Sequence, residues 1–411
     1  MRVDEAKLIS VAQALAGVLE RARPLETEKL ALAEAWGRTL ALDLASTRTQ
    51  PPEPVSAMDG YALNALDGTD PTQLLKVIGT SSAGHRYDGV LQRGETVRIF
   101  TGAIVPPGAD AVQMQELVTR DGDQISLQQP VTSGRSVRAA GLDFSTGEIL
   151  LKAGRRLGAP ELALAAAMNH GHVPVVRRPR VAILATGDEL VRPGTKPGPD
   201  QIVASNSFAI AAHVLAAGGE PIDLGIAQDS FAALESGILA ARAAKADVLV
   251  TLGGASVGDH DLVKSALTRE GMDLHFWRIA MRPGKPLIHG SLGAMHILGL
   301  PGNPVSSIVC GHLFLQPLVR ALSGDIKAGS DISVAGVLGA DIAANDARED
   351  YVRATWQVNG ENLPVVTAFG VQDSSMLRVL AEAQCLLVRA PHAPAGKKGD
   401  ACRIIRLEAG L

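Results

Sequence analysis

The chain has few of the residues that build disulfide-stabilised or redox sites. It contains 3 cysteines, Cys310, Cys385 and Cys402, which lie far apart and form no CxxC pair. This spacing predicts neither a disulfide framework nor a zinc site, and it favours a reducing, cytoplasmic compartment. Aromatic residues make up only 3% of the sequence. We therefore expect cores packed with aliphatic side chains.

The chain also lacks a charge excess and a membrane signal. Its formal net charge is -4 over 411 residues, which provides no basic field for nucleic acid or for an anionic membrane. The N-terminal residues MRVDEAKLIS do not resemble a signal peptide, and no run of about 18 apolar residues is present. The sequence predicts neither nucleic acid nor membrane as a partner.

The common nucleotide-binding motifs are missing as well. No GxxxxGK[ST] segment is present, because Gly284-Lys285 is followed by proline and lacks the preceding glycine loop. No GxGxxG segment follows an expected strand. These absences argue against a P-loop NTPase and a dinucleotide-binding fold. A phosphate-bearing ligand would have to be held in another way.

What is present is a long globular chain rich in shaped loops. Hydrophobic residues make up 46% and charged residues 20%, with 43 glycines and 23 prolines. A length of about 100 to 200 residues per domain predicts several domains. Glycine- and proline-rich loops are where functional sites are usually found.

The pattern of apolar residues changes along the chain. Residues 4–22 have helical spacing, and residues 160–170 form a second expected helix that returns the chain towards the first. Between them, residues 46–145 consist of short β-like runs broken by Gly, Pro and Asp. From residue 179 strands and helices alternate, which predicts a parallel sheet with helices on both faces. The last 80 or so residues are again β-like and predict a small barrel or sandwich.

Four loops of the α/β region carry chemical groups where an expected strand ends, and ligands of such sheets bind at that edge. The glycine-rich loop Thr251 to Asp261 (TLGGASVGDHD) predicts an oxyanion cradle, because glycines let backbone N–H groups approach an anion. Cations for phosphate follow another strand, and carboxylates suited to Mg²⁺ follow two more. The cradle residues are Gly253, Gly254, Ser256 and Gly258; the cations are Arg282 and Lys285; the carboxylates are Glu189, Asp229 and Asp261.

Six segments resemble, in the same order, the motifs of the molybdopterin molybdenumtransferase family, the bacterial molybdenum insertases that are similar to the E domain of gephyrin. They are VSAMDGYAL (55–63), TGAIVPPGADAVQMQE (101–116), ATGDEL (185–190), TLGGASVGDHD (251–261), RPGKP (282–286) and LPGNPVS (300–306). The resemblance covers nearly the whole chain, and the first two motifs are much more specific than a glycine loop.

The resemblance implies a multidomain α/β plus β fold. Its parts are a discontinuous helical and extended stalk (1–45 and 146–178), a mostly-β domain (46–145), a three-layer α/β molybdopterin-binding domain (179–326) and a C-terminal β-barrel (327–411). It also implies that the chain inserts molybdate into adenylylated molybdopterin with Mg²⁺, releasing AMP and completing the molybdenum cofactor.

In this family the site lies in a homodimer, in a cleft between the α/β domain of one subunit and the β domain of the other. By motif, Asp59 and Thr101 would face the cleft from the β domain. The remaining residues that the resemblance places there are Glu189, Asp229, Asp261, Arg278, Arg282, Pro301, Pro304 and either Ser374 or Ser375. Implied partners include the preceding adenylyltransferase and the enzymes that accept the cofactor.

Several of these residues have simpler explanations. Asp59 would be an ordinary turn aspartate without the resemblance, and Thr101 could end a strand. Pro301 and Pro304 are expected to shape the chain entering a helix, while Ser374 and Ser375 could cap one. The histidines form no metal-binding pattern, although His260 lies within the glycine-rich motif. Trp277 could stack on a pterin but is more typical of a strand core.

The chain departs from the family at five positions. Leu252 stands where serine is common, Ala204 where aspartate precedes Ser-Asn, and Leu142 where glutamate is common. Arg278 and Arg282 replace lysines and keep the charge. Leu252 and Ala204 remove polar groups near the expected ligand, which leaves altered ligand contacts or a divergent paralogue as alternatives. Such a paralogue would act as an adenylyltransferase or as a non-enzymatic carrier or scaffold.

Overall fold

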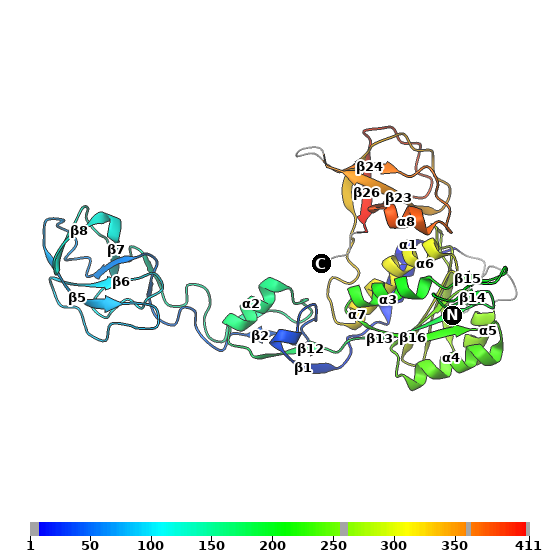
Figure 1. Ribbon diagram of the computed structural model, residues 1–411, viewed down its shortest axis with the longest axis horizontal. Coiled ribbons are helices and arrows are strands. Elements are labelled where there is room, and N and C mark those ends of the chain that lie inside the picture. Colours follow the sequence, from blue (N-terminus) through cyan, green and yellow to red (C-terminus); the bar gives the residue numbers. More distant parts are fainter. Residues whose placement is uncertain (1–7, 255–261, 359–362, 408–411) are drawn as a thin grey trace.

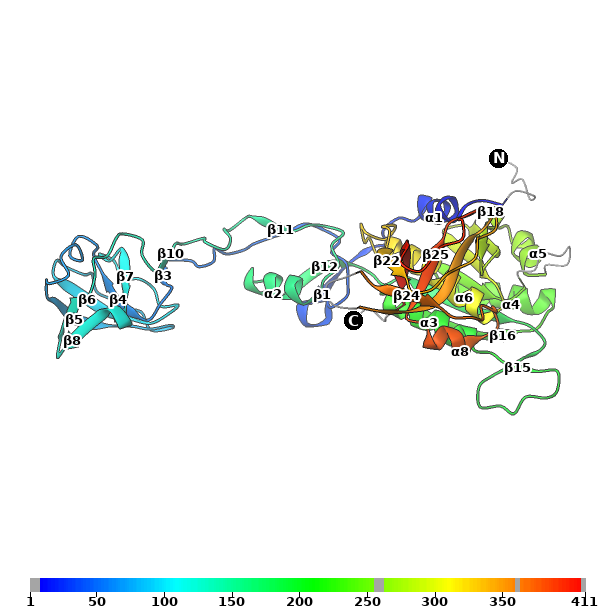
Figure 2. The same cartoon turned by 90° about the horizontal axis from the view of Figure 1, so that it is seen from above.

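The computed structural model of the chain describes residues 8–254, 262–358 and 363–407. The molecule is elongated, with a β unit at one end, a narrow stalk in the middle and a large body at the other end (Figure 1). The same separation is seen from above (Figure 2). The body contains the α/β region and the C-terminal β region, which lie against each other.

A six-stranded sheet forms the centre of the α/β region, in the order β16-β13-β17-β21-β20-β18. Its strands are β13 (Arg180–Thr186), β16 (Glu220–Ala227), β17 (Val248–Leu252), β18 (Asp273–Arg278), β20 (Pro286–Leu292) and β21 (Met295–Leu300). The first four strands in the sheet order are mutually parallel, whereas β20 is antiparallel to both β21 and β18. The expectation of an all-parallel sheet was therefore wrong at this edge. Tight connections from β18 to β20 and from β20 to β21 leave no crossover helix, so these strands run antiparallel.

Helices cover both faces of this sheet, so the expected three-layer α/β architecture is confirmed. One face carries α1 (Val11–Glu20), α3 (Asn206–Ala216), α6 (Pro304–Cys310), η3 (Gly311–Leu315) and α7 (Gln316–Leu322), and the other carries α4 (Phe231–Ala243) and α5 (Leu262–Arg269). Neighbouring residues of β13 face opposite layers: Ile183 packs in the first core and Leu184 in the second. This alternation follows from the two-residue period of a strand.

The predicted apolar helix after Pro304 runs over 19 residues to Leu322, with a wide π-helical turn at Gly311–Leu315. Pro317 follows that turn. Proline lacks an N–H and clashes with the carbonyl four residues earlier, and a widened turn relieves both problems. The helix is long and apolar enough to cross a membrane by length and composition, but 67% of its apolar window is buried inside the molecule. Here it is a core helix.

The stalk has its own small core around Leu40, Phe144 and Met168. Its elements are β1 (Thr27–Ala31), η1 (Leu32–Glu34), β2 (Leu44–Ala45), β11 (Ile149–Leu151), α2 (Ala159–Ala167) and β12 (His172–Val176). The first helix does not join this core. Val11, Ala14 and Val18 of α1 pack in the α/β core instead. The expectation that α2 returns the chain to the first helix was therefore wrong, and by contacts the expected stalk segment 1–45 begins only after α1.

The distal β unit is one six-stranded sheet in the order β7-β4-β6-β5-β9-β8. Two further short strands, β3 and β10, pair where the unit joins the stalk. The elements are β3 (Val55–Ser56), β4 (Gly60–Leu63), β5 (Leu75–Ser81), β6 (Glu95–Ile99), β7 (Ala111–Met114), η2 (Gln115–Leu117), β8 (Val118–Asp121), β9 (Gln124–Leu127) and β10 (Val137–Arg138). The absence of an α-helix between β3 and β10 agrees with the mostly-β prediction.

The C-terminal region forms a closed five-stranded barrel, because β23 pairs with both β24 and β25 and completes the ring through β22 and β26. Its elements are β22 (Val334–Leu338), β23 (Glu349–Gln357), β24 (Val365–Ala368), α8 (Leu377–Glu382), β25 (Cys385–Arg389) and β26 (Ala401–Arg406). The short strand β19 (Met281–Arg282) of the α/β region pairs with β23. Backbone hydrogen bonds therefore tie the barrel to the α/β body.

Three histidines lie together at the antiparallel edge of the α/β sheet. The rings of His275 and His289 are 4.8 Å apart between centroids, and those of His289 and His296 are 6.4 Å apart. His289 is fully buried, and its Nε2 atom has no hydrogen-bond partner. Burial, with a further contribution from His275, lowers the pKa of His289 to about 3. The folded protein therefore holds this imidazole neutral.

This neutral histidine predicts a loss of stability in acid. An unfolded histidine takes up a proton near pH 6.5, whereas His289 in the folded state does not until about pH 3. Acidification from pH 6.5 to 5 should therefore favour unfolding by about 2 kcal/mol through this residue alone. His289→Leu should flatten the dependence of the unfolding free energy on pH in this range, measured by urea titration. An unchanged slope would contradict this assignment.

Candidate active site

A cavity of about 640 Å³ opens at the carboxyl ends of the parallel strands of the α/β region. Its walls come from the loops after β13, β16, β17 and β21, from the start of α3 and from one residue of the barrel. This is the edge of the sheet at which the sequence predicted a site. Of the predicted residues, the cavity is lined by Glu189, Asp229, Gly253, Gly254, Pro301, Pro304 and Ser375.

The loop after β17 requires glycine at two successive positions. Gly253 and Gly254 have φ angles of +100° and +66°, and a Cβ on Gly253 would lie 2.6 Å from the carbonyl oxygen of Thr186. A side chain would therefore both strain the backbone and push the loop away from β13. The two glycines keep this backbone close to the floor of the cavity, as an anion cradle needs.

The start of α3 adds polar groups that the sequence analysis did not select. Ser205, Asn206 and Ser207 line the cavity, and Asn206 donates a hydrogen bond to the carbonyl oxygen of Gly302 at 2.8 Å. The first N–H groups of an α-helix have no partner within the helix and favour anions. The signal was present in the sequence, because Ser-Asn-Ser directly before an apolar helix is typical of a helix start.

The ionisable side chains among the described residues that line the cavity are Glu189 and Asp229, both acidic. Glu189 folds over the end of β13, where a Cβ on Gly187 would lie 2.6 Å from its Oε2. Asp188 accepts a hydrogen bond from the backbone N–H of Asp229 at 3.0 Å. Burial raises the pKa of Asp229, and the charges of Asp188 and Glu189 raise it further. The cavity is therefore electrostatically unfavourable for an anion by itself.

The predicted cations lie outside the residues that line this cavity. Arg282 is bound to the barrel: its guanidinium pairs with Asp350 and Asp346 and contacts Asn345. The hydrogen bond to Asp350, together with the two carboxylate charges, raises the pKa of Arg282 above its usual value. Its charge is thus already matched within the protein. Lys285 also does not line the cavity.

Arg278 stacks on Trp277, with its guanidinium carbon 4.0 Å from the ring centroid, and Lys264 lies over the same ring at 4.3 Å. Trp277 is only 9% exposed and belongs to the second core of the α/β sheet. Its burial supports the interpretation of Trp277 as a core residue rather than as a residue that stacks on a pterin.

The barrel reaches the cavity through the loop before α8. Ser375 lines the cavity, and its backbone N–H and hydroxyl both donate to Asp373. Next to it, Ser374 accepts hydrogen bonds from the side chain of Asn303 and, through its carbonyl, from the backbone of Val305. Neither serine caps α8, for which no side-chain cap bond is present. Asn303, which connects the two regions, was not among the residues predicted from the sequence.

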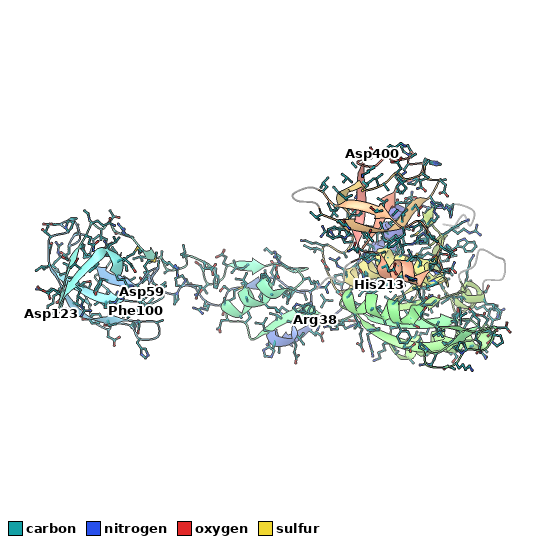
Figure 3. All side chains as sticks on the ribbon, turned by 45° about the horizontal axis from the view of Figure 1, so that its top comes forward. Arg38, Asp59, Phe100, Asp123, His213 and Asp400 are labelled. Atoms are coloured by element: carbon teal, nitrogen blue, oxygen red, sulfur yellow. The ribbon has the colours of Figure 1, made fainter. Side chains whose placement is uncertain are left out.

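Asp59 directly precedes β4 in the distal β unit, which lies at the opposite end of the molecule from the α/β body (Figures 1 and 3). Thr101 follows β6 in the same unit. The backbone N–H and the hydroxyl of Thr101 both donate to Asp59 Oδ1 at 2.8 Å. These bonds, the backbone one first, hold the pKa of Asp59 below its usual range, and Arg98 lowers it further. Gly60 is needed beside it, because a Cβ there would collide with the carbonyl of Gln113. Asp59 is thus an ionised, oriented carboxylate on the surface.

The remaining predicted residues of the glycine-rich motif are Ser256, Gly258 and Asp261, and they lie outside the described residues, as does His260. Two of the five predicted catalytic residues, Glu189 and Asp229, line one cavity together. Asp59 and Thr101 form a second group at the other end of the molecule.

Comparison with known proteins decides the family. Residues 9–169 match the MoeA N-terminal region (domain I and II), residues 182–321 a probable molybdopterin binding domain, and residues 335–407 the MoeA C-terminal region (domain IV). The molybdopterin molybdenumtransferase of Haemophilus influenzae is 34% identical over 93% of this chain and 94% of its own length. The chain belongs to the molybdopterin molybdenumtransferase family.

Other relatives agree. The molybdopterin molybdenumtransferase of a Nostoc species is 37% identical over 88% of this chain and 85% of its own length. The crystal structure of the molybdopterin biosynthesis moeA protein from Pyrococcus horikoshii OT3 superposes with a TM-score of 0.84 at 27% identity, covering 97% of this chain and 99% of that one. The chain is therefore a molybdopterin molybdenumtransferase of molybdenum cofactor biosynthesis, with molybdate as the substrate that supplies the metal.

The geometry of the distal pair predicts that Thr101 positions Asp59. Thr101→Val keeps the backbone N–H bond but removes the hydroxyl bond, whose net contribution is about 1 kcal/mol. We expect kcat for this molybdopterin molybdenumtransferase to fall about fivefold, with the melting temperature lowered by no more than a few degrees, while Thr101→Ser stays near wild type. Steady-state kinetics of the three proteins test this. Equal losses in the Val and Ser variants would show that the hydroxyl bond is not what matters.

Proposed function

We propose that this chain inserts molybdate into adenylylated molybdopterin with Mg²⁺, releasing AMP and forming molybdenum cofactor as the last step of its biosynthesis. The reaction would take place in the cytoplasm. The observation that carries the proposal is the cavity itself, which combines a glycine cradle, a helix N-terminus and two carboxylates at one sheet edge. Phosphate chemistry needs fixed N–H donors and a way to neutralise charge.

The donor set fits Mg²⁺. Glu189 and Asp229 supply the hard carboxylate oxygens that this ion prefers. Burial, together with the charges of Asp188 and Glu189, raises the pKa of Asp229, and a bound cation would offset these effects. Within the described residues no three His, Cys, Asp or Glu side chains are grouped to hold a metal alone. Mg²⁺ commonly takes one or two carboxylates and completes its shell with water and substrate phosphates. Glu189 and Asp229 would hold it, with Asp261 as the proposed third ligand.

When bound, Mg²⁺ would offset the negative charge of the pyrophosphate and polarise its phosphorus. The chain's own groups supply the rest. The backbone N–H of Gly254 and those at the start of α3 would bind the phosphate and molybdate oxygens, whereas the N–H of Gly253 donates to the carbonyl oxygen of Leu300. Hydrolysis of the phosphoanhydride consumes one water and gives AMP and the phosphate of molybdopterin, which makes insertion effectively irreversible. Among the other predicted residues, Pro301 and Pro304 shape the wall, and Ser375 closes it from the barrel.

Asp59 and Thr101 would complete the site from a second copy of the chain. Within one chain they lie at the opposite end of the molecule from the cavity (Figures 1 and 3). Both hydrogen bonds from Thr101 use Asp59 Oδ1, which leaves Oδ2 as the oxygen that can face a ligand. Because the pKa of this carboxyl is lowered, it is ionised at neutral pH and suited to orient water by accepting a hydrogen bond rather than to take up a proton. A homodimer with shared sites would bring it to the partner's cavity.

The reaction is tested directly by incubating the purified protein with adenylylated molybdopterin, Mg²⁺ and molybdate. We expect AMP release together with active cofactor, scored by reconstitution of an apo-molybdoenzyme. Absence of both products would reject the proposal. ATP-dependent adenylylation of molybdopterin by this chain would instead identify the adenylyltransferase alternative, and unchanged cofactor production in cells carrying Asp59→Asn would favour a carrier or scaffold. Contacts with the adenylyltransferase and cofactor-accepting enzymes are part of the proposal.

The shared site predicts complementation between two inactive variants. Asp59→Asn and Asp229→Asn should each abolish AMP release as homodimers, since every site loses one carboxylate. When the two chains are co-expressed, half of the dimers should be mixed, and each mixed dimer should contain one intact site. We therefore expect about a quarter of the wild-type rate from the mixture. A rate that stays at background in verified mixed dimers would exclude a shared site.

A further inference from the structure

One side of the cavity is apolar and is built by a short ribbon that projects from the α/β body. The ribbon consists of β14 (Leu190–Val191) and β15 (Ile202–Val203), which pair with Leu190 opposite Ile202. Figure 2 shows the segment that carries β15 standing out from the body. Paired residues of neighbouring strands, and residues two apart on one strand, share a face. Leu190 and Ile202 therefore lie on one face of the ribbon, and both line the cavity together with Val203 and Ala204.

Leu252, at the end of β17, extends this apolar surface into the floor of the cavity. It is 2% exposed, and Ala204 is 7% exposed, so both form a fixed base. Ile202 is different, because 57% of its surface is exposed although it lies on the cavity rim. We call Leu190, Ile202, Ala204 and Leu252 the apolar wall. The two family departures that removed polar groups, Ala204 and Leu252, thus line the same cavity.

The two sides of the cavity differ in polarity. Beside the apolar wall lie the polar groups already described: the glycine cradle, Ser205 to Ser207, and the carboxylates Glu189 and Asp229. A ligand with a charged end and an apolar flat end would match both parts. Ligand sites are commonly lined by hydrophobic side chains, with a few polar groups that fix orientation. The volume of about 640 Å³ suits a ligand of nucleotide size.

We propose that the apolar wall is the subsite for a planar heteroaromatic ring of the substrate, with Ile202 closing on the ring face. This proposal rests on the proposed function, because that substrate carries phosphate next to two ring systems, a purine and a pterin. The phosphates would bind the glycine cradle and the start of α3. The exposed surface of Ile202 would become buried only when a ring is present, which gives the ribbon side chain a direct share in binding energy.

The test separates ring binding from phosphate binding. Isothermal titration calorimetry would measure the affinity of the protein for three probes: AMP, ribose 5-phosphate and unsubstituted pterin. The variants are Ile202→Ala, which shortens the wall, and Leu252→Ser, which makes its floor polar. Leu239→Ala is the matched control, because Leu239 is 54% exposed on α4 and does not line the cavity.

We expect Ile202→Ala and Leu252→Ser to weaken binding of one ring-bearing probe at least about fourfold, since each methylene group removed from an apolar contact costs about 0.8 kcal/mol. Ribose 5-phosphate should bind all four proteins equally, and the control should match wild type. A selective loss for AMP would identify the purine as the occupant, and a selective loss for pterin would identify the pterin.

Three results would overturn the proposal: equal affinities of wall and control variants for both ring-bearing probes, a parallel loss for ribose 5-phosphate, or no binding of either ring-bearing probe to wild type. The AMP-release assay on the wild-type protein is independent of these titrations. If the protein releases AMP but the wall variants bind the ring-bearing probes as tightly as wild type, only the subsite proposal is rejected. Absence of AMP release and of cofactor formation would instead reject the proposed function.

Discussion

A narrow connector of two chain segments, between the stalk and the distal β unit, sets the architecture of this molecule. Residues 46–55 and 139–148 run side by side between the stalk and the distal β unit, held by backbone hydrogen bonds such as Gln50 to Phe144 at 2.9 Å and Ser46 to Glu148 at 2.9 Å. These bonds keep the distal unit apart from the body. Asp59 therefore lies in a unit that is separate from the α/β body. Any chemistry that uses both Asp59 and the α/β cavity needs two copies of the chain.

The second constraint is electrostatic. The cavity is lined by two carboxylates in the described residues, while Arg282, expected to bind phosphate, is paired with carboxylates of the barrel. The arginine that would attract the substrate instead fixes the barrel, and the barrel in turn places Ser375 in the cavity wall. An anionic substrate then depends on backbone N–H groups and on a divalent cation. This distribution of charge is the physical reason to expect Mg²⁺ in the reaction.

Local sequence signals predicted the structure correctly where the backbone conformation requires a particular residue type, such as glycine or proline. Gly253 and Gly254 were expected to adopt positive φ angles, and they do; their role as an anion cradle stays a prediction. The helix that follows Pro304 and the closed barrel were also expected. The carboxyl ends of parallel strands meet at one edge, so Glu189 and Asp229 could be placed together from strand order alone.

Other features depend on contacts between distant segments, which no local pattern records. The pairing of Arg282 with Asp350 joins residues 68 positions apart and links the α/β region to the barrel. The first helix packs on the α/β core rather than the stalk, because its buried side chains contact η3 and α7. Likewise, the apolar wall joins Leu252 to Ala204, which the sequence showed only as two unrelated departures.

The central claim is that the distal β unit of one chain completes the cavity of another. Site-specific crosslinking measures this most directly, with Met58→Cys beside Asp59 and Ile202→Cys on the cavity rim, since both side chains are well exposed in the isolated chain. A short bifunctional maleimide should give covalent dimers of the double variant and not of either single variant. Crosslinks confined to single chains, or none above the single variants, would contradict the account.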